Sequence, residues 1–242
     1  MLTPPPLVVA RHLQRSREVL YGHGMTTRQF TAMDRFIQGL DQAVRTVFAP
    51  PPAAVRANPA QALSDPGLDS SLDPGERELA GRLMRINHAG EIAAQALYQG
   101  QALSARLPRV REAMEQAARE ENDHLAWTAE RIAELDSHTS WLDPVWYAQS
   151  FAIGALAGWA GDKWSLGFVA ETEHQVVRHL DEHLALLPQK DHKSRAILEQ
   201  MRTDEAHHAT TAMEAGAAAL PGPVKALMGL SSKIMTRTAF WI

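Results

Sequence analysis

Apolar residues recur every three or four positions along most of the chain after residue 75, which places them on one face of a helix. No segment shows the sustained alternation of apolar and polar residues that is typical of strands. The pattern predicts four long helices at about 77–104, 109–135, 163–186 and 190–218, an apolar fifth helix at 145–161 and a short C-terminal helical segment. The connections are brief except around 136–162. The sequence therefore predicts an all-α fold, a four-helix bundle of two antiparallel hairpins joined by a long crossover.

The first 75 residues have a different character. Residues 28–48 have apolar side chains at helical spacing, and the segment that follows is rich in proline, aspartate and serine. We interpret that segment as a linker outside the core, because prolines and short polar residues favour turns and loops. We expect three parts: a disordered extension at 1–24, an amphipathic helix with its linker at 25–75, and the bundle domain at 76–242.

Each of the four long predicted helices carries one glutamate inside its apolar stripe. The stripes are Met84, Asn87, Glu91, Ala94 and Tyr98; Met114, Ala117, Ala118, Glu121, Leu125, Thr128, Ile132 and Leu135; Leu166, Val169, Ala170, Glu173, Val176, Val177, Leu180 and Leu184; and Ile197, Met201, Glu205, His208, Ala209 and Ala212. Burying a carboxylate without a partner costs free energy, and four that converge in one core would repel one another. The pattern therefore predicts that positive charge lies between them.

Two histidines complete this candidate site. His124 follows Glu121 by three positions and His208 follows Glu205 by three, so each pair projects from one helix face. Cysteine is absent, so a metal must be held by imidazole and carboxylate groups. Glutamate from two helices and Glu-x-x-His from two others form the ligand set of ferritin-like di-iron and di-manganese carboxylate bundles. The predicted metal ligands are Glu91, Glu121, His124, Glu173, Glu205 and His208.

A third Glu-x-x-His match, from Glu171 to His174, is interpreted as an exposed polar pair. It shares its helix face with Gln175, Arg178 and Glu182, which is typical of a solvated surface. His179 is a candidate for a residue behind the ligands or in a proton relay, with a surface histidine as the alternative. Tyr98 lies on the face of Glu91, where core packing is the simpler interpretation.

Charge and hydropathy limit the partners. The net charge of -4 gives no electrostatic reason to expect nucleic acid, because proteins that bind it normally show a basic patch. The uncharged run at 144–161 is shorter than the roughly 20 apolar residues of a membrane span, and glycines interrupt it. We interpret it as a bundle helix, buried or in contact with lipid, with an interfacial segment and a true membrane span as the alternatives. The N-terminus does not have the order of a secretory signal, so we expect a cytoplasmic chain.

Several motifs resemble the demethoxyubiquinone hydroxylase family, the di-iron monooxygenases of ubiquinone biosynthesis. They are MRINHAGEIAAQALYQGQ, ENDHLAW, GFVAETEHQV, HLDEHL and MRTDEAHH, and the resemblance covers roughly residues 25–242. It implies a ferritin-like fold, two ferrous ions held by the same six residues, and hydroxylation of a polyprenyl methoxy-methyl-benzoquinol with dioxygen and two electrons. The family's third-helix glutamate could be matched to Glu171 or Glu173, and the apolar stripe favours Glu173. Glu121 and Glu205 are the expected bridging ligands.

The lipid substrate implied by the resemblance also predicts a peripheral protein on the cytoplasmic face of the cell membrane. The apolar run and the C-terminal residues 231–242 are the candidate contacts. A homo-oligomer and a complex with other ubiquinone-biosynthesis proteins both stay open.

Three other interpretations use the same helices. A ferritin-like ferroxidase or iron-storage protein has this kind of site but needs no route for an apolar substrate. A radical-generating ribonucleotide reductase subunit normally needs a longer chain. A metal-free scaffold is the structural alternative, and metal analysis separates it from the others.

Overall fold

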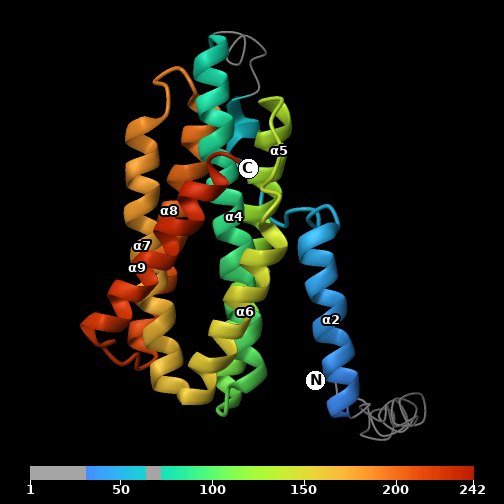
Figure 1. Ribbon diagram of the computed structural model, residues 1–242, viewed down its shortest axis with the longest axis vertical. Coiled ribbons are helices and arrows are strands. Elements are labelled where there is room, and N and C mark those ends of the chain that lie inside the picture. Colours follow the sequence, from blue (N-terminus) through green and yellow to red (C-terminus); the bar gives the residue numbers. More distant parts are fainter. Residues whose placement is uncertain (1–30, 64–71) are drawn as a thin grey trace, which may run out of the picture. The chain divides into compact units, whose positions relative to one another are not determined.

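The computed structural model describes residues 31–63 and 72–242, and all regular elements in these ranges are helical. The predicted extension at 1–24 lies outside the described residues. Residues 39–242 form one compact unit, to which the account below is confined. The elements, labelled in Figure 1, are α2 (Ala32–Phe48), η1 (Pro59–Leu63), α4 (Pro74–Ser104), α5 (Pro108–Glu134), α6 (Asp143–Ala160), α7 (Asp162–Leu186), α8 (His192–Glu214) and α9 (Gly222–Ala239).

Local sequence signals explain where these helices begin. Asp73 caps α4: its side chain accepts a hydrogen bond from the backbone N–H of Glu76, whose own side chain accepts one from Asp73. Proline occupies the first turn of α4, α5, α6 and α9, where its missing N–H leaves no hydrogen bond unmade. The predicted boundaries are thus close to those observed, and the C-terminal segment is a longer helix than expected.

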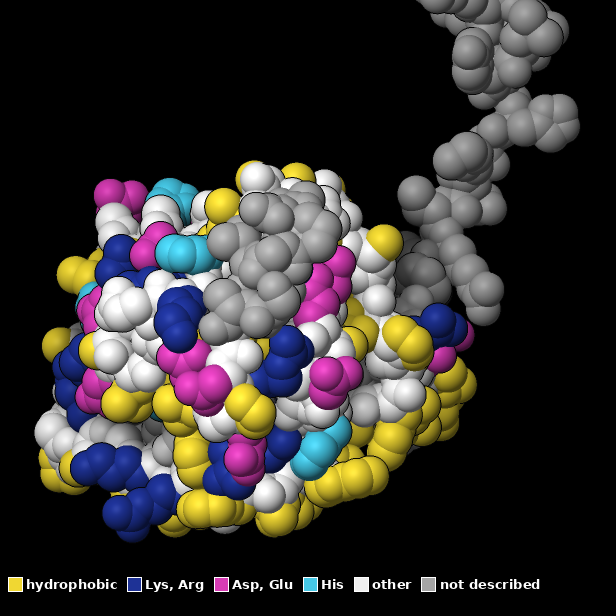
Figure 2. Space-filling view, turned by 90° about the horizontal axis from the view of Figure 1, so that it is seen from above, with side chains coloured by type: hydrophobic (Ala, Val, Ile, Leu, Met, Phe, Trp, Pro, Cys, Tyr) yellow, Lys and Arg dark blue, Asp and Glu magenta, His cyan; other side chains and the backbone are white. Residues whose placement is uncertain are grey.

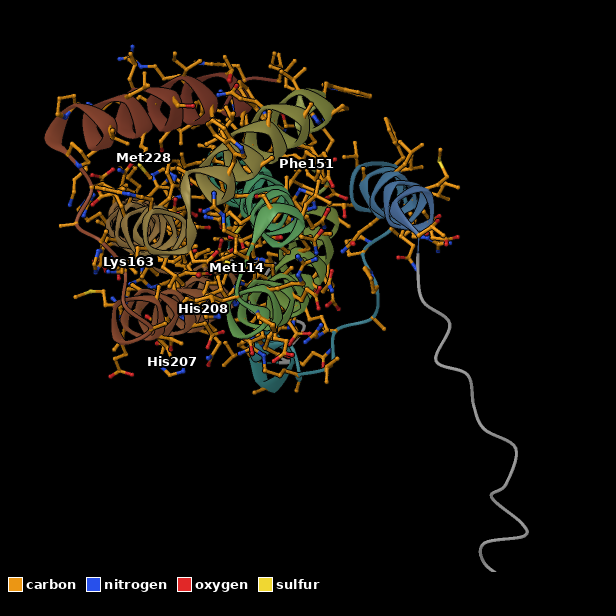
Figure 3. All side chains as sticks on the ribbon, turned by 90° about the horizontal axis from the view of Figure 1, so that it is seen from below. Met114, Phe151, Lys163, His207, His208 and Met228 are labelled. Atoms are coloured by element: carbon orange, nitrogen blue, oxygen red, sulfur yellow. The ribbon has the colours of Figure 1, made fainter. Side chains whose placement is uncertain are left out.

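Helices α4, α5, α7 and α8 form the bundle, and α6 is the crossover between the two hairpins (Figure 1). The predicted apolar stripes point into this bundle, where the core residues include Met84, Leu125, Leu180 and Met201. Figure 3 looks along the bundle and shows α6 and α9 on the side of α4 and α7. Buried residues on four helices therefore converge on one interior.

The apolar run forms α6, which packs along α4. A Cβ atom at Gly154 would lie 2.2 Å from the carbonyl oxygen of Leu97, and one at Gly100 would lie 2.3 Å from that of Phe151. Glycines thus let the two backbones approach more closely than any other residue would allow. None of the described helices combines the length and the apolar character needed to span a membrane. The interpretation as a bundle helix is confirmed by this packing.

One prediction about the first 75 residues is wrong. Residues 54–63, expected to lie outside the core, pack against the bundle: Ala60 is buried in the main apolar cluster and Ala54 lies against it. Asn58 is also buried, and its amide donates to Glu130 of α5. Small apolar side chains between prolines carry no periodic signal, so composition alone did not reveal this contact.

Candidate metal centre

Three of the four predicted carboxylates and one imidazole meet at the centre of the bundle. Ligand atoms of Glu91, Glu121, His124 and Glu205 all lie within 4.8 Å of one another, and all four residues are buried. The Nδ1 atom of His124 lies 3.3 Å from Glu91 Oε2, 3.2 Å from Glu121 Oε2 and 3.0 Å from Glu205 Oε1. The helical stripes therefore bring together α4, α5 and α8 as the sequence predicts.

The two remaining predicted ligands adjoin this group. The Nδ1 atom of His208 lies 3.0 Å from Glu205 Oε2 and 3.5 Å from Glu121 Oε1. Glu173 of α7 is buried and interacts with Glu205, and it accepts a hydrogen bond from the hydroxyl of Tyr98. Figure 3 shows His208 toward the bundle interior, whereas the neighbouring His207 lies on the outer side. Tyr98 therefore contacts the site directly, beyond its part in core packing.

Electrostatics show what these carboxylates lack. Burial, followed by repulsion from Glu121, raises the pKa of Glu91 well above its usual range. Burial and the charges of Glu205 and Glu121 do the same to the pKa of Glu173. Glu205 differs: burial opposes ionisation, but hydrogen bonds with His124 and His208 lower its pKa. With all four carboxylates ionised, the centre would hold more negative charge than the two imidazoles offset.

The residues present fit a pair of divalent cations. Glu121 Oε1 and Glu173 Oε2 are buried and accept no hydrogen bond from any residue within 31–63 or 72–242. Buried polar atoms are normally satisfied, and carboxylate oxygens left open toward one another are expected where metal ions bind. Mixed imidazole and carboxylate donors suit iron or manganese better than calcium, which takes oxygen donors alone.

Both imidazoles are held from behind by an acid of the opposite helix. The Nε2 atom of His124 lies 2.9 Å from Asp204 Oδ2, and that of His208 lies 2.7 Å from Glu120 Oε2. These contacts leave Nδ1 of each ring facing the central carboxylates. Sequence reasoning missed both acids, although each directly precedes a predicted ligand, Glu121 or Glu205, which is a signal that could have found them.

An apolar cavity of about 260 Å³ reaches the centre from the side of α4, α6, α7 and α9. Glu91, Glu173 and Glu205 form its inner end, and most other lining side chains are apolar. They include Ile86, Ala94, Leu97, Ile153, Phe168, Val176, Leu180, Leu227, Met228 and Met235. The centre is thus open toward an apolar space.

His179 also lines this cavity. Its ring centroid lies 3.9 Å from that of His183, whose Nδ1 is 2.9 Å from Asn87 Oδ1. The Nε2 atom of His179 is buried and bonds no group among the described residues. Burial lowers the pKa of His179, so the ring is held neutral. The alternative of an ordinary surface histidine is therefore wrong.

The interpretation of Glu171 and His174 as an exposed pair holds for His174 only. His174 is exposed, but Glu171 is buried beneath α9, where Lys225 Nζ lies 2.8 Å from Glu171 Oε2. Gln175 donates to its other oxygen. Glu171 is thus partnered by a cation of the protein, and the preference for Glu173 as the residue facing the centre agrees with the structure.

A four-helix bundle with one glutamate on each of two helices and Glu-x-x-His on each of the other two has the arrangement of the ferritin-like di-metal carboxylate proteins. Within that class the comparison of sequences is specific. Residues 78–239 match the family described as ubiquinone biosynthesis protein COQ7, and the chain belongs to this family.

Relatives resemble the chain over nearly its whole length. A 3-demethoxyubiquinol 3-hydroxylase of Nitrosococcus oceani is 60% identical over 218 residues, which are 90% of this chain and 100% of the relative. Proteins of the same name from Nitrosomonas eutropha and Acinetobacter baumannii are 55% and 53% identical, over 87% and 89% of this chain and 99% and 100% of the relatives. Among solved structures, a dodecameric thioferritin of Bacteroides fragilis aligns with 61% of this chain and 88% of its own, at 21% identity and a TM-score of 0.48.

Proposed function

We propose that this chain is a 3-demethoxyubiquinol 3-hydroxylase, which adds one hydroxyl group to the ring of a polyprenyl methoxy-methyl-benzoquinol. One atom of dioxygen enters the ring and the other leaves as water, with two electrons and two protons consumed. The observation that carries the proposal is the apolar cavity that ends at Glu91, Glu173 and Glu205. The names of the relatives support the same substrate.

The proposed cofactor is a pair of ferrous ions held by Glu91, Glu121, His124, Glu173, Glu205 and His208. When bound, iron supplies the redox chemistry that activates dioxygen, which side chains alone do not provide. The protein's own residues orient this site: Asp204 and Glu120 fix the two imidazole rings, and the hydroxyl of Tyr98 fixes Glu173. Such contacts hold ligands in position before the substrate arrives.

The cavity binds the substrate and excludes water. Its apolar walls suit the isoprenoid tail, whereas Nε2 of His179, which bonds no group within 31–63 or 72–242, is available to a quinol hydroxyl. Small-molecule sites usually combine mostly apolar walls with a few polar groups that orient the ligand. A ferroxidase would use the same carboxylates but has no need of this cavity.

We also propose peripheral association with the cytoplasmic face of the membrane, where such a substrate dissolves. Figure 2 shows hydrophobic side chains gathered along the lower edge of the view. Large apolar residues are exposed on two of the helices that line the cavity, namely Leu156 and Trp159 of α6 and Leu227, Leu230 and Ile234 of α9. Exposed apolar groups on cavity-lining helices are suited to an interfacial position.

Reconstitution tests the reaction. The protein is loaded anaerobically with ferrous iron and given a demethoxyubiquinol, a reductant and isotopically heavy dioxygen. Mass spectrometry of the quinol should show one heavy oxygen atom in the ring. A protein that binds about two irons and turns over dioxygen without labelling the ring would contradict hydroxylation and favour the ferroxidase.

Vesicle sedimentation tests the membrane proposal. Leu230→Asp with Ile234→Asp should reduce binding to anionic vesicles, because two charges would replace apolar contacts on α9. Met213→Asp on α8 is the control, since Met213 is 56% exposed, close to the 55% of Leu230 and 53% of Ile234. Equal sedimentation of all three proteins would refute the role of α9.

A further inference from the structure

Residues 54–63, which we name the strap, cross the side of the metal centre opposite the cavity. The backbone N–H of Val55 and the Nε of Arg56 donate to the two oxygens of Asp123, each at 2.7 Å. Asn58 donates to Glu130 at 2.7 Å, and η1 packs against α8. The strap is therefore bound to both helices that carry a Glu-x-x-His pair.

Arg56 extends from the strap to the back of one imidazole. Its Nη1 donates to Asp204 Oδ2 at 2.7 Å, and the same oxygen lies 2.9 Å from His124 Nε2. Gln200 donates to Asp204 Oδ1 at 2.9 Å, so both oxygens of Asp204 are fixed. The guanidinium carbon also lies 4.9 Å from the ring centroid of Trp127. Arg56 thus covers His124 and holds the acid that orients it.

The other imidazole has no such cover. His208 Nε2 contacts Glu120, whose side chain is 40% exposed, whereas that of Asp204 is 16% exposed. Among the residues that the structure describes, Glu120 is bound by Gln116 and His208 and by no lysine or arginine. A longer, exposed side chain that no lysine or arginine hydrogen-bonds restrains its histidine less, because its rotamers stay accessible.

We propose that Arg56 is a positioning residue of the metal centre: by clamping Asp204 onto His124, it makes the His124 half retain its metal ion longer than the His208 half. The inference rests on the proposed metal centre. The physical reason is that a histidine whose outer nitrogen is held by a fixed acid loses less freedom on binding metal, and loss of such an acid commonly weakens binding by about 10- to 100-fold.

The clamp comes from a segment that precedes the part of the chain matched by the family model. The match to the family begins at residue 78, whereas Arg56 and the rest of the strap precede it. The bundle supplies the six proposed ligands and both outer acids. Among the described residues, the strap's arginine forms a hydrogen-bonded ion pair with Asp204 but only a longer-range interaction with Glu120, and so makes the two halves of the centre unequal.

Release of iron tests the inference without any turnover. The full chain is loaded anaerobically with two equivalents of ferrous ion and mixed with an excess of a ferrous chelator, and the absorbance of the chelate is followed. The wild-type protein should release one iron quickly and the other slowly. Arg56→Gln should accelerate the slow phase by about 10- to 100-fold and leave the fast phase unchanged.

Two further variants show whether Arg56 acts through Asp204. Asp204→Asn should accelerate the same phase, and the double variant should add little to either change, because both remove one interaction. Arg202→Gln is the matched control: Arg202 pairs with Asp181 at 3.0 Å and is 42% exposed, close to the 40% of Arg56. It should release both irons as the wild-type does.

The outcomes separate the clamp from the metal centre and from folding. Wild-type rates in both Arg56→Gln and Arg56→Lys, or equal acceleration of both phases, would overturn the clamp. So would a wild-type protein that releases two irons at one rate. Arg56→Lys, which keeps the charge but not the fork of donors, provides the test if Arg56→Gln melts early without metal. Less than one iron bound by the wild-type would instead overturn the proposed metal centre.

Discussion

The two sides of the metal centre have opposite characters. On the side of α4 and α7, Glu91 and Glu173 face an apolar cavity. On the side of α5 and α8, the outer nitrogen of each imidazole contacts an acid. Arg56 of the strap donates to one of these acids, Asp204. An open apolar side suits the entry of a lipid, whereas a polar, tied side suits retention of metal ions. The cavity that we propose for the substrate thus lies on the side of α4 and α7, whereas both imidazoles and the acids behind them belong to α5 and α8.

The pKa values of histidines on the two sides are shifted in opposite directions. On the cavity side, burial and then repulsion from His179 lower the pKa of His183 to about 3. On the strap side, burial acts in the same sense, but Glu205, Glu121 and Glu120 outweigh it and raise the pKa of His208 to about 9. The residue type is the same, so the environment alone sets the sign.

The largest expected effect comes from the carboxylate that the cavity side contributes on α7. Glu173→Gln keeps the shape and removes the charge, so hydroxylation should fall by more than about 100-fold, since changes behind the ligands alone cost 10- to 100-fold. Bound iron, measured by atomic emission, should fall as well. Glu182→Gln, at an exposed position of the same helix, is the control. Full activity with two bound irons in Glu173→Gln would show that α7 contributes no metal ligand through Glu173.

Filling the cavity should impair use of the substrate without changing iron binding. Gly90 lines the cavity, and a Cβ atom there would meet nothing within 4 Å. Gly90→Leu should therefore fold and bind iron normally but lower kcat/KM for a long-tailed quinol by about tenfold, the effect of a few misplaced methylene groups in an apolar pocket.

Gly39→Leu is the control for this substitution. It is the same change at a helical glycine with equally open surroundings, and Gly39 does not line the cavity. An equal loss on a short-tailed quinol would place the effect at the ring, and a loss of iron would contradict the division between the sides.

Acid should lower the free energy of unfolding through His183. The unfolded chain protonates His183 near its usual pKa of about 6.5, whereas the folded chain resists protonation down to about 3. The unfolded state thus binds more protons in this window, and the free energy of unfolding falls as pH decreases, by about 1 kcal/mol per pH unit from this residue.

Urea unfolding of the metal-free protein at pH 7 and pH 5 measures this dependence. His183→Gln should lose less stability than the wild-type between these values, because the titrating ring is gone. His174→Gln, which changes an exposed histidine of the same helix, should lose as much as the wild-type. Identical losses in all three proteins would mean that His183 is accessible to protons in the native state.

The helical period of apolar residues predicted the interior of the bundle better than the segments that pack on its outer faces. The stripes around Glu91, Glu121, Glu173 and Glu205 needed only the rule that residues three and four apart share a face. The same rule does not say which segment lies over the outer face of a helix. Arg56 belongs to a segment without period, and Lys225 reaches Glu171 from a helix more than 50 positions away. Both contacts join residues that are far apart in the sequence, so no local pattern predicts them.

The smallest expected effect concerns Glu171, two positions from Glu173 and on the other face of α7. Because Lys225 and Gln175 bind its carboxylate, Glu171→Gln should weaken the docking of α9 by up to about 1 kcal/mol, the range of a partly exposed ion pair. Iron content should stay at the wild-type value, since Glu171 faces away from the central carboxylates.

Thermal melts of Glu171→Gln, Lys225→Gln and the double variant measure the coupling between these two residues. If the pair acts as the structure indicates, the double variant should lose less than the sum of the single losses. Strictly additive losses would show that the ion pair contributes nothing in solution. A loss of iron in Glu171→Gln, with iron retained in Glu173→Gln, would instead mean that α7 presents its other face to the centre, and the cavity would then not end at the metal ligands.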